Sequence, residues 1–236
     1  MLKCENLTLS LYLVANKHTA NSANRSDEEF LGIVREALQG GVDIVQLREK
    51  SLSSKDFYTL ACKTKNLCDK YKIPLIINDR IDIALACGAS GVHIGIKKDL
   101  PVKVARRILG KDKILGLSLN QISEIKELGE DLCCVDYLGV GAIWDTPTKV
   151  DSITIGTKGL ANIALEVKKL ATMQNLKKPP IVAIGGIYDT NIHELAGIDI
   201  AGVAVVRSIM DATNPTQAAQ NLKSKVLEIL QPSQAK

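Results

Sequence analysis

The polar side chains along and after one apolar segment have the types and spacing of an anion-binding site. Residues 43–49 read Asp-Ile-Val-Gln-Leu-Arg-Glu and are followed by Lys50. If this segment is a strand, alternate residues point in opposite directions, so Gln46, Arg48 and Lys50 share one face. One amide and two cations that converge inside a protein are costly unless an anion meets them. The triplet therefore predicts a site for an anionic group.

Two carboxylates follow the next two apolar segments. Asp79 comes directly after Asn78, which ends the apolar run that begins at residue 74, and Asp99 follows residues 91–95. Mg²⁺ is usually held by one or two carboxylates together with water and phosphate oxygens. Cations next to such carboxylates suggest a diphosphate bound with Mg²⁺. The structural alternative is that Asp79 and Arg80 pair with each other or with neighbouring residues.

Hydroxyls and a further cation follow two later segments. Ser118 ends the apolar run of residues 114–118, and residues 136–141 lead into a loop that carries Thr146, Thr148 and Lys149. A buried strand that delivers such groups at its carboxyl end is typical of sites in α/β proteins. We therefore add these four residues to the candidate site.

The last two apolar segments end in a pattern typical of phosphate binding. Gly185 and Gly186 follow residues 181–184, and residues 202–205 are followed by Val206, Arg207 and Ser208. Parallel barrels often bind phosphate after their seventh and eighth strands. The pattern predicts a second anionic substrate, with a tight turn as the structural alternative for the two glycines.

Eight strand and helix units must position these residues. The expected strands are residues 9–15, 43–49, 74–80, 91–95, 114–118, 136–141, 181–186 and 202–206, and the expected helices include 54–70, 121–128, 160–173, 190–196 and 215–230. Ser26 followed by Glu29 predicts a capping box at the start of the first helix. Strands that are apolar throughout, at even spacing, indicate a parallel sheet closed into a single (β/α)8 TIM barrel. A doubly wound open sheet is the second choice, because no G-x-G-x-x-G opens the first helix.

Composition limits the functional classes. The 236 residues are 46% hydrophobic and 24% charged, with no linker-like interruption, so we expect one domain over residues 1–236. A net charge of +4 and 3% aromatic residues favour phosphorylated small molecules over nucleic acid. Six cysteines without metal spacing indicate free thiols in a reducing compartment. Since neither a signal peptide nor a membrane span is evident, we expect a cytoplasmic location.

Six motifs, taken in order, resemble the thiamine phosphate synthase family over nearly the whole chain. They are Gln46-Leu47-Arg48-Glu49-Lys50, Ile76-Ile77-Asn78-Asp79-Arg80, Gly91-Val92-His93-Ile94-Gly95, Asp136-Tyr137-Leu138-Gly139-Val140-Gly141, Thr146-Pro147-Thr148-Lys149 and Ala183-Ile184-Gly185-Gly186-Ile187. The resemblance implies a (β/α)8 enzyme that joins hydroxymethylpyrimidine diphosphate to thiazole phosphate, or to its carboxylated form. The products would be thiamine phosphate and diphosphate.

The resemblance also implies a role for each matched residue. The pyrimidine diphosphate would be held by Gln46, Arg48, Lys50, Asn78, Ser118 and Lys149. Mg²⁺ would be bound by Asp79 and Asp99, and the thiazole phosphate by Thr146, Thr148, Gly186, Val206 and Arg207. In a dissociative substitution the protein chiefly stabilises the departing diphosphate, for which Lys149 and Arg48 are the first choices as catalytic groups. His93 is expected in the interior, and Trp144 as packing or as a wall of the thiazole pocket.

The chain departs from the family pattern at two places. The family reads H-x-G-Q-x-D where this chain has His93-Ile94-Gly95-Ile96-Lys97-Lys98-Asp99, which is one residue longer and lacks the Gln. Arg207 stands where the family commonly has Ser. Arg207 either binds phosphate through two parallel hydrogen bonds or points into solvent, and we favour the first.

Two other functions stay open. A thiazole tautomerase of the same fold would have no use for a diphosphate site, and a non-catalytic sensor of thiamine precursors would keep the pocket without turnover. Whether the chain forms a homo-oligomer, and whether it is fused to or partnered with a hydroxyethylthiazole kinase, is also open.

Overall fold

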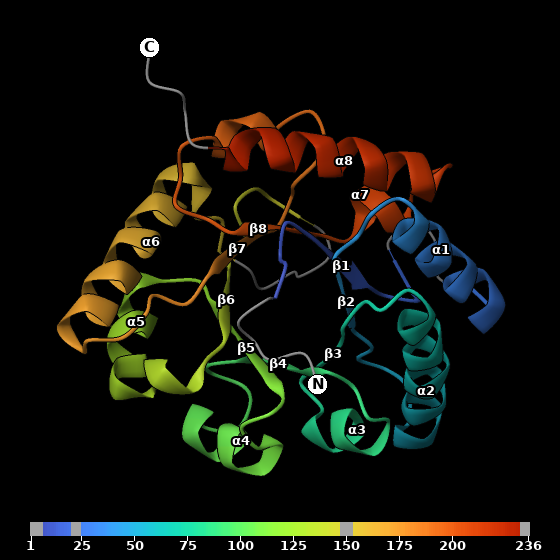
Figure 1. The fold of residues 1–236 in the computed structure, drawn as a ribbon, viewed down its shortest axis with the longest axis horizontal. Helices are drawn as coiled ribbons and strands as arrows, with labels where there is room; N and C mark the ends of the chain where they lie inside the picture. Colours follow the sequence, from blue (N-terminus) through green and yellow to red (C-terminus); the bar gives the residue numbers. More distant parts are fainter. Residues whose placement is uncertain (1–6, 20–24, 147–152, 232–236) are drawn as a thin grey trace.

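Eight parallel strands close into a barrel in the order in which they follow one another along the chain (Figure 1). The computed structural model describes residues 7–19, 25–146 and 153–231. The strands are β1 (Leu11–Ala15), β2 (Ile44–Leu47), β3 (Leu75–Asn78), β4 (Gly91–Gly95), β5 (Ile114–Leu119), β6 (Tyr137–Val140), β7 (Ile181–Ile184) and β8 (Gly202–Val205). The closed ring confirms the predicted TIM barrel and excludes the doubly wound sheet.

Helices surround the barrel (Figure 1). They are α1 (Asp27–Gln39), α2 (Ser54–Lys70), α3 (Ile81–Ala86), α4 (Val102–Leu109), α5 (Ile122–Leu128), α6 (Gly156–Met173), α7 (Arg207–Met210) and α8 (Pro215–Leu230). The capping box before α1 is confirmed, since the Ser26 hydroxyl accepts from the Glu29 amide and the Glu29 carboxylate accepts from the Ser26 amide. None of the helices among the described residues is long and apolar enough to cross a membrane.

The inward positions of the strands change from apolar to polar toward their carboxyl ends. Ile44 is followed on the same face of its segment by Gln46 and Arg48, and Ile76 is followed by Asn78. The apolar members form an inner cluster of Leu9, Tyr12, Val14, Ile44, Ile76, Ile114, Tyr137, Val182 and Ala204. The outward positions pack against the helices in a second, larger core. The barrel interior is therefore a packed plug beneath a polar mouth.

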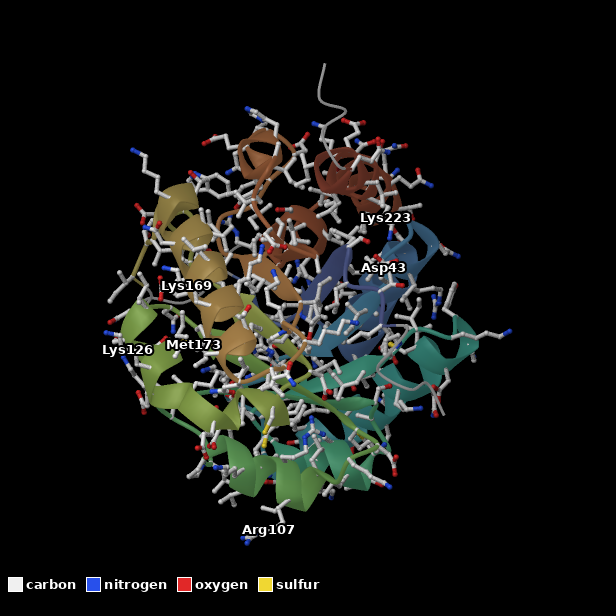
Figure 2. The ribbon with its side chains drawn as sticks, turned by 60° about the vertical axis from the view of Figure 1, so that its left-hand side comes forward. Asp43, Arg107, Lys126, Lys169, Met173 and Lys223 are labelled. Carbon is white, nitrogen blue, oxygen red and sulfur yellow. The ribbon has the colours of Figure 1, made fainter. Side chains whose placement is uncertain are left out.

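The last helix helps to join the two ends of the sheet. β1 pairs with β8 in parallel register, with Tyr12 opposite Ala204, and α8 packs against α1. The Asp43 carboxylate accepts from the backbone amide of Leu11 at 2.8 Å and from the ammonium of Lys223 on α8. Figure 2 shows Asp43 and Lys223 side by side at the edge of the barrel. In the same view Arg107, Lys126 and Lys169 point away from the barrel.

Two expected helices differ from the structure. The helix expected at residues 190–196 is only a 3-10 turn, Ile192–Leu195, because this short segment lies between polar residues and a glycine and cannot repay the cost of helix nucleation. The helix expected from residue 160 begins earlier, at Gly156. The short α7 and the 3-10 turn Gly129–Cys134 were not predicted.

We predict that close strand packing at the start of β4 makes Gly91 essential for stability. A Cβ atom at Gly91 would lie 2.0 Å from the carbonyl oxygen of Ile114 on β5, so the backbone would have to move. Gly91→Ala should lower the free energy of unfolding by about 2 kcal/mol or more in urea denaturation. In the matched control Gly32→Ala, within α1, the added Cβ meets no atom within 4 Å, and we expect a gain of about 0.5–1 kcal/mol. Equal effects of the two substitutions would contradict the packing described here.

Candidate active site

A cavity of about 630 Å³ opens at the carboxyl ends of the strands. Its size is in the range of about 300–1,000 Å³ that is typical of small-molecule sites. The predicted residues that line it are Gln46, Arg48, Lys50, Asn78, Asp79, Asp99, Ser118, Thr146, Gly186, Val206 and Arg207. Thr148 and Lys149 lie outside the residues that the structure describes. The structure thus brings the described candidates around one pocket.

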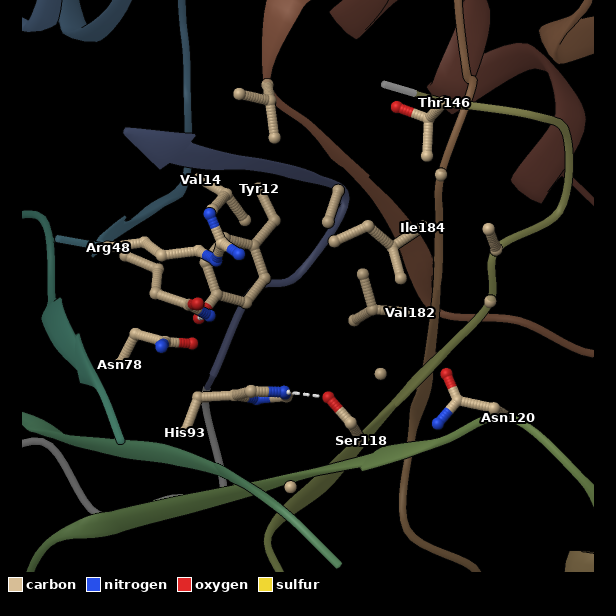
Figure 3. Close-up of a pocket in the computed structure, with 18 of the residues that line it drawn as sticks. Tyr12, Val14, Arg48, Asn78, His93, Ser118, Asn120, Thr146, Val182 and Ile184 are labelled. Carbon is tan, nitrogen blue, oxygen red and sulfur yellow. Dashed lines mark hydrogen bonds between the residues drawn. The ribbon is translucent and has the colours of Figure 1, made fainter. Parts of the chain in front are cut away.

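The cationic wall comes from β2. Figure 3 shows Arg48 and Asn78 on one side of the pocket and Thr146 on the other. Burial lowers the pKa of the Arg48 guanidinium, while the charges of Asp79 and Glu49 act in the opposite direction. The Lys50 ammonium lies 3.9 Å from the Asp79 carboxylate and is well exposed. This wall presents one half-buried and one exposed cation to an incoming anion.

Asp79 and Asp99 lie close enough to influence each other. Burial and then the Asp99 charge raise the pKa of Asp79, and Lys50 and Arg48 offset this only in part. Asp99 accepts a 2.7 Å hydrogen bond from the backbone amide of Gly95, so the longer loop after β4 still delivers this carboxylate to the pocket. Arg80 binds Asp82 and Ser54, and Asp79 lies 3.9 Å from Lys50, so the two residues pair with neighbours and not with each other. A carboxylate whose charge is disfavoured by burial and by a second carboxylate is suited to binding a cation.

Asp79 and Asp99 form a site with two protein ligands, which suits Mg²⁺ better than a metal that is coordinated by protein side chains alone. Within the described ranges no group of three or more His, Cys, Asp or Glu side chains could hold a metal ion. Mg²⁺ commonly takes one or two carboxylates and completes its octahedral shell with water and phosphate oxygens. Asp79 and Asp99 are therefore the residues that could hold it.

A second wall is made by the ends of β7 and β8. Gly185 and Gly186 have φ values of 102° and 67°, which favour glycine. A Cβ at Gly186 would lie 2.6 Å from the Cβ of Trp144, a residue that packs on the core and does not line the pocket. No helix begins at these two glycines, and the next element is the 3-10 turn Ile192–Leu195. Instead α7 begins at Arg207, directly after β8.

Arg207 lines the pocket and is anchored behind it. Its Nε atom donates to Asp211 at 3.1 Å, and Asp211 also pairs with the buried Arg25 at 3.0 Å. The side chain is therefore held at the pocket wall, which differs from a freely solvated charge.

A chain of buried hydrogen bonds forms the floor of the pocket. Gln46 Nε2 lies 2.8 Å from Tyr12 Oη, which lies 2.7 Å from Tyr137 Oη. Tyr137 Oη lies 2.9 Å from His93 Nδ1, and His93 Nε2 lies 2.8 Å from Ser118 Oγ. Figure 3 shows the last of these contacts as a dashed line. The sequence reading placed His93 in the interior, as observed, but overlooked both tyrosines. A tyrosine within an otherwise apolar strand needs a partner for its hydroxyl, and this could have indicated a buried hydrogen bond at Tyr12 and Tyr137.

The pocket rim contains another residue that the sequence did not reveal. Glu124, almost fully buried, accepts from the backbone amides of Asn120 and Gln121 and lies 3.1 Å from the ammonium of Lys97. Lys97 belongs to the longer loop after β4, so this ion pair fixes that loop against the start of α5.

A closed parallel barrel with a polar pocket at the carboxyl ends of its strands is the architecture of a (β/α)8-barrel enzyme. The family model described as thiamine monophosphate synthase matches residues 11–209. The chain belongs to this family.

Known relatives match almost the whole chain. A thiamine-phosphate synthase of Methanobrevibacter smithii is 48% identical over 217 residues, which cover 92% of this chain and 95% of the relative. One of Campylobacter jejuni is 46% identical over 224 residues, covering 95% and 97%. The solved thiamine phosphate pyrophosphorylase of Pyrococcus furiosus superposes with a TM-score of 0.77 at 31% identity, covering 95% and 98%. A 3-hexulose-6-phosphate synthase, at 15% identity and a TM-score of 0.63 with 92% and 99% covered, shares the fold alone.

We predict that Asp79→Asn raises the thermal stability of the metal-free protein. The pKa of Asp79 is higher in the folded state than the usual 3.8, so ionised Asp79 destabilises the fold. The destabilisation develops as the pH rises from 3.8 through the folded-state pKa. Asn removes the charge and tolerates the left-handed backbone at this position, where φ is 62°. Without Mg²⁺, the variant should melt at a higher temperature than the parent at pH 7, with a smaller difference near pH 4.

The matched control for this measurement is Asp82→Asn. A hydrogen bond from Arg80 lowers the pKa of Asp82, so its loss should not raise the melting temperature. A lower melting temperature of Asp79→Asn at pH 7 would show that the carboxylate is there for structural pairing.

Proposed function

We propose that the chain condenses hydroxymethylpyrimidine diphosphate with thiazole phosphate, or its carboxylated form, to give thiamine phosphate and diphosphate. The carboxylated form would release carbon dioxide as well. The observation that carries this proposal is a single pocket with two different walls. One wall has Arg48 and Lys50 beside Asp79 and Asp99, and the other has the Gly185-Gly186 turn beside the end of β8. Membership of the thiamine monophosphate synthase family supports the same reaction. One wall suits a diphosphate and the other a phosphate.

The reaction is a substitution in which the bond to the leaving group breaks first. The bond between the pyrimidine methylene carbon and the diphosphate oxygen breaks, and its electron pair leaves with diphosphate. The electron-rich aminopyrimidine stabilises the resulting cation, and the lone pair of the thiazole nitrogen then forms the new carbon–nitrogen bond. No protein nucleophile is required, so catalysis depends on charge compensation at the leaving group.

The cationic wall supplies that compensation. Arg48 and Lys50 bind the diphosphate, and we assign Lys149 to the same role from its place in the family motif. A Mg²⁺ ion held by Asp79 and Asp99 would neutralise charge on the diphosphate oxygens. Gln46, Asn78 and Ser118 then bind the pyrimidine at the floor, where polar side chains meet the apolar plug.

The thiazole phosphate takes the second wall, at the ends of β7 and β8. Thr146, Thr148, Gly186, Val206 and Arg207 are the residues we assign to it. A loop after the seventh strand and a short extra helix after the eighth form the phosphate site in many barrels, and α7 begins at the corresponding place.

The direct test is to mix the protein with both substrates and Mg²⁺ and to follow thiamine phosphate and diphosphate. The proposal requires equal amounts of the two products and their loss when a chelator is added. Turnover of a thiazole phosphate alone would favour the tautomerase. Tight binding of both ligands without any product would favour the sensor.

We predict that Arg207→Ser weakens the binding of one substrate only. Loss of a charge-assisted hydrogen bond is worth about 1.5–3 kcal/mol, so the KM for thiazole phosphate should rise by roughly tenfold or more. The KM for the pyrimidine diphosphate should stay within about twofold, because its wall is unchanged. Asp211 keeps its pairing with Arg25, so the fold should be retained.

The control for this variant is Arg107→Ser on α4, where the side chain points away from the barrel (Figure 2). An unchanged KM for thiazole phosphate in Arg207→Ser would remove Arg207 from the site.

A further inference from the structure

The hydrogen-bond chain at the pocket floor has a direction. The Gln46 amide nitrogen can only donate, and it lies 2.8 Å from Tyr12 Oη. The buried Tyr12 hydroxyl needs an acceptor for its own proton, and Tyr137 Oη, at 2.7 Å, is its other close partner. Tyr137 Oη then accepts from Tyr12, and His93 Nδ1, at 2.9 Å, is the acceptor for the Tyr137 proton. Each hydroxyl has a single proton to donate, so the direction set at Gln46 is passed along the chain.

The direction fixes the tautomer of His93. An Nδ1 atom that accepts from Tyr137 carries no proton, so the neutral imidazole has its proton on Nε2 and donates to Ser118 Oγ. The proton of Ser118 is then directed away from His93, and Ser118 lines the pocket. Burial raises the pKa of both tyrosines, so both phenols keep the protons that the chain needs.

The backbone leaves space for this series of hydrogen bonds. In the strand register His93 on β4 lies beside Gly116 on β5, and Gly116 lies beside Tyr137 on β6. A Cβ at Gly116 would lie 2.4 Å from Tyr137 Oη and 2.5 Å from His93 Nδ1. The histidine and the tyrosine therefore meet across a position that only glycine can occupy. On the next level Gly139 leaves a similar space, since its Cβ would lie 3.1 Å from His93 Cε1.

We propose that Tyr12, Tyr137 and His93 are positioning residues that hold the Ser118 hydroxyl as a hydrogen-bond donor to the substrate. The atom that meets Ser118 is therefore an acceptor, and a ring nitrogen of the aminopyrimidine meets this requirement. This identification of the ligand atom rests on the proposed function. The direction of the chain rests only on the protein.

The direction can be measured in the resting protein without any substrate. The protein has three histidines, so ¹⁵N-histidine labelling should give three sets of ring signals in an NMR spectrum. The set that disappears in His93→Gln belongs to His93. At pH 7.5 the proposal requires a neutral ring with the proton on Nε2 and a bare Nδ1. A proton on Nδ1 would reverse the chain and overturn the proposal. In Tyr137→Phe the preference for this single tautomer should be lost.

Positioning is tested by a double-mutant cycle with Tyr137→Phe and Ser118→Ala. Tyr137→Phe should raise the KM for the pyrimidine diphosphate about three- to tenfold and leave the KM for thiazole phosphate unchanged. In the Ser118→Ala background the same exchange should have almost no further effect, because Tyr137 acts through Ser118. If the fold-changes in KM of the two single variants multiply in the double variant, Tyr137 does not act through Ser118, and the proposal is overturned.

The control is Tyr71→Phe, at the end of α2 and outside the pocket, which should leave both KM values unchanged. Melting temperatures of all variants identify any general loss of folding. If the unmodified protein makes no thiamine phosphate, the proposed function fails, and the NMR measurement still decides the direction of the chain. If the protein is active and His93 carries its proton on Nδ1, the positioning proposal alone fails.

Discussion

Closure of eight parallel strands forces every second side chain of each strand into one narrow interior. Polar groups can occupy this interior only where they have partners or face a ligand. The chain meets this condition by filling the amino-terminal half with apolar residues and by placing polar groups toward the carboxyl ends. The linked hydroxyls of Tyr12 and Tyr137 lie at the boundary between the two halves. The floor of the pocket therefore holds a continuous chain of hydrogen bonds that ends at Ser118, whereas the walls carry the charges that await a ligand.

The two walls differ in how they hold charge. Arg48, Lys50, Asp79 and Asp99 form a mixed group in which the pKa of Asp79 stays raised despite the nearby cations. Such a group is poorly satisfied alone and suits a metal ion together with a diphosphate. On the other wall Arg207 is already held by Asp211, and glycine backbone replaces side chains at the turn after β7. A smaller anion with one phosphate matches that wall.

Much of this arrangement could be predicted from the sequence because it depends on local patterns. The helical spacing of residues 54–70 predicts α2 at its observed bounds. The polar residues at the ends of the predicted strands include most of the predicted residues that line the pocket. The rest depends on which strand levels meet. The contact between His93 and Tyr137 requires the register that places Gly116 between them, and no single segment contains that information. Likewise, Arg80 binds Asp82 and not the adjacent Asp79, although the sequence allows either partner. The residues near Lys149 lie outside the described structure, so the role of that lysine stays a prediction.

The central claim is that one pocket binds two anions at separate walls. Titration calorimetry with thiazole phosphate, in the absence and in the presence of saturating Mg²⁺ and inorganic diphosphate, tests it most directly. Separate walls predict that thiazole phosphate still binds one per chain when diphosphate is present, with an affinity within a few-fold of the original. Loss of thiazole phosphate binding in direct proportion to added diphosphate would mean that both anions compete for a single site, and would contradict the account.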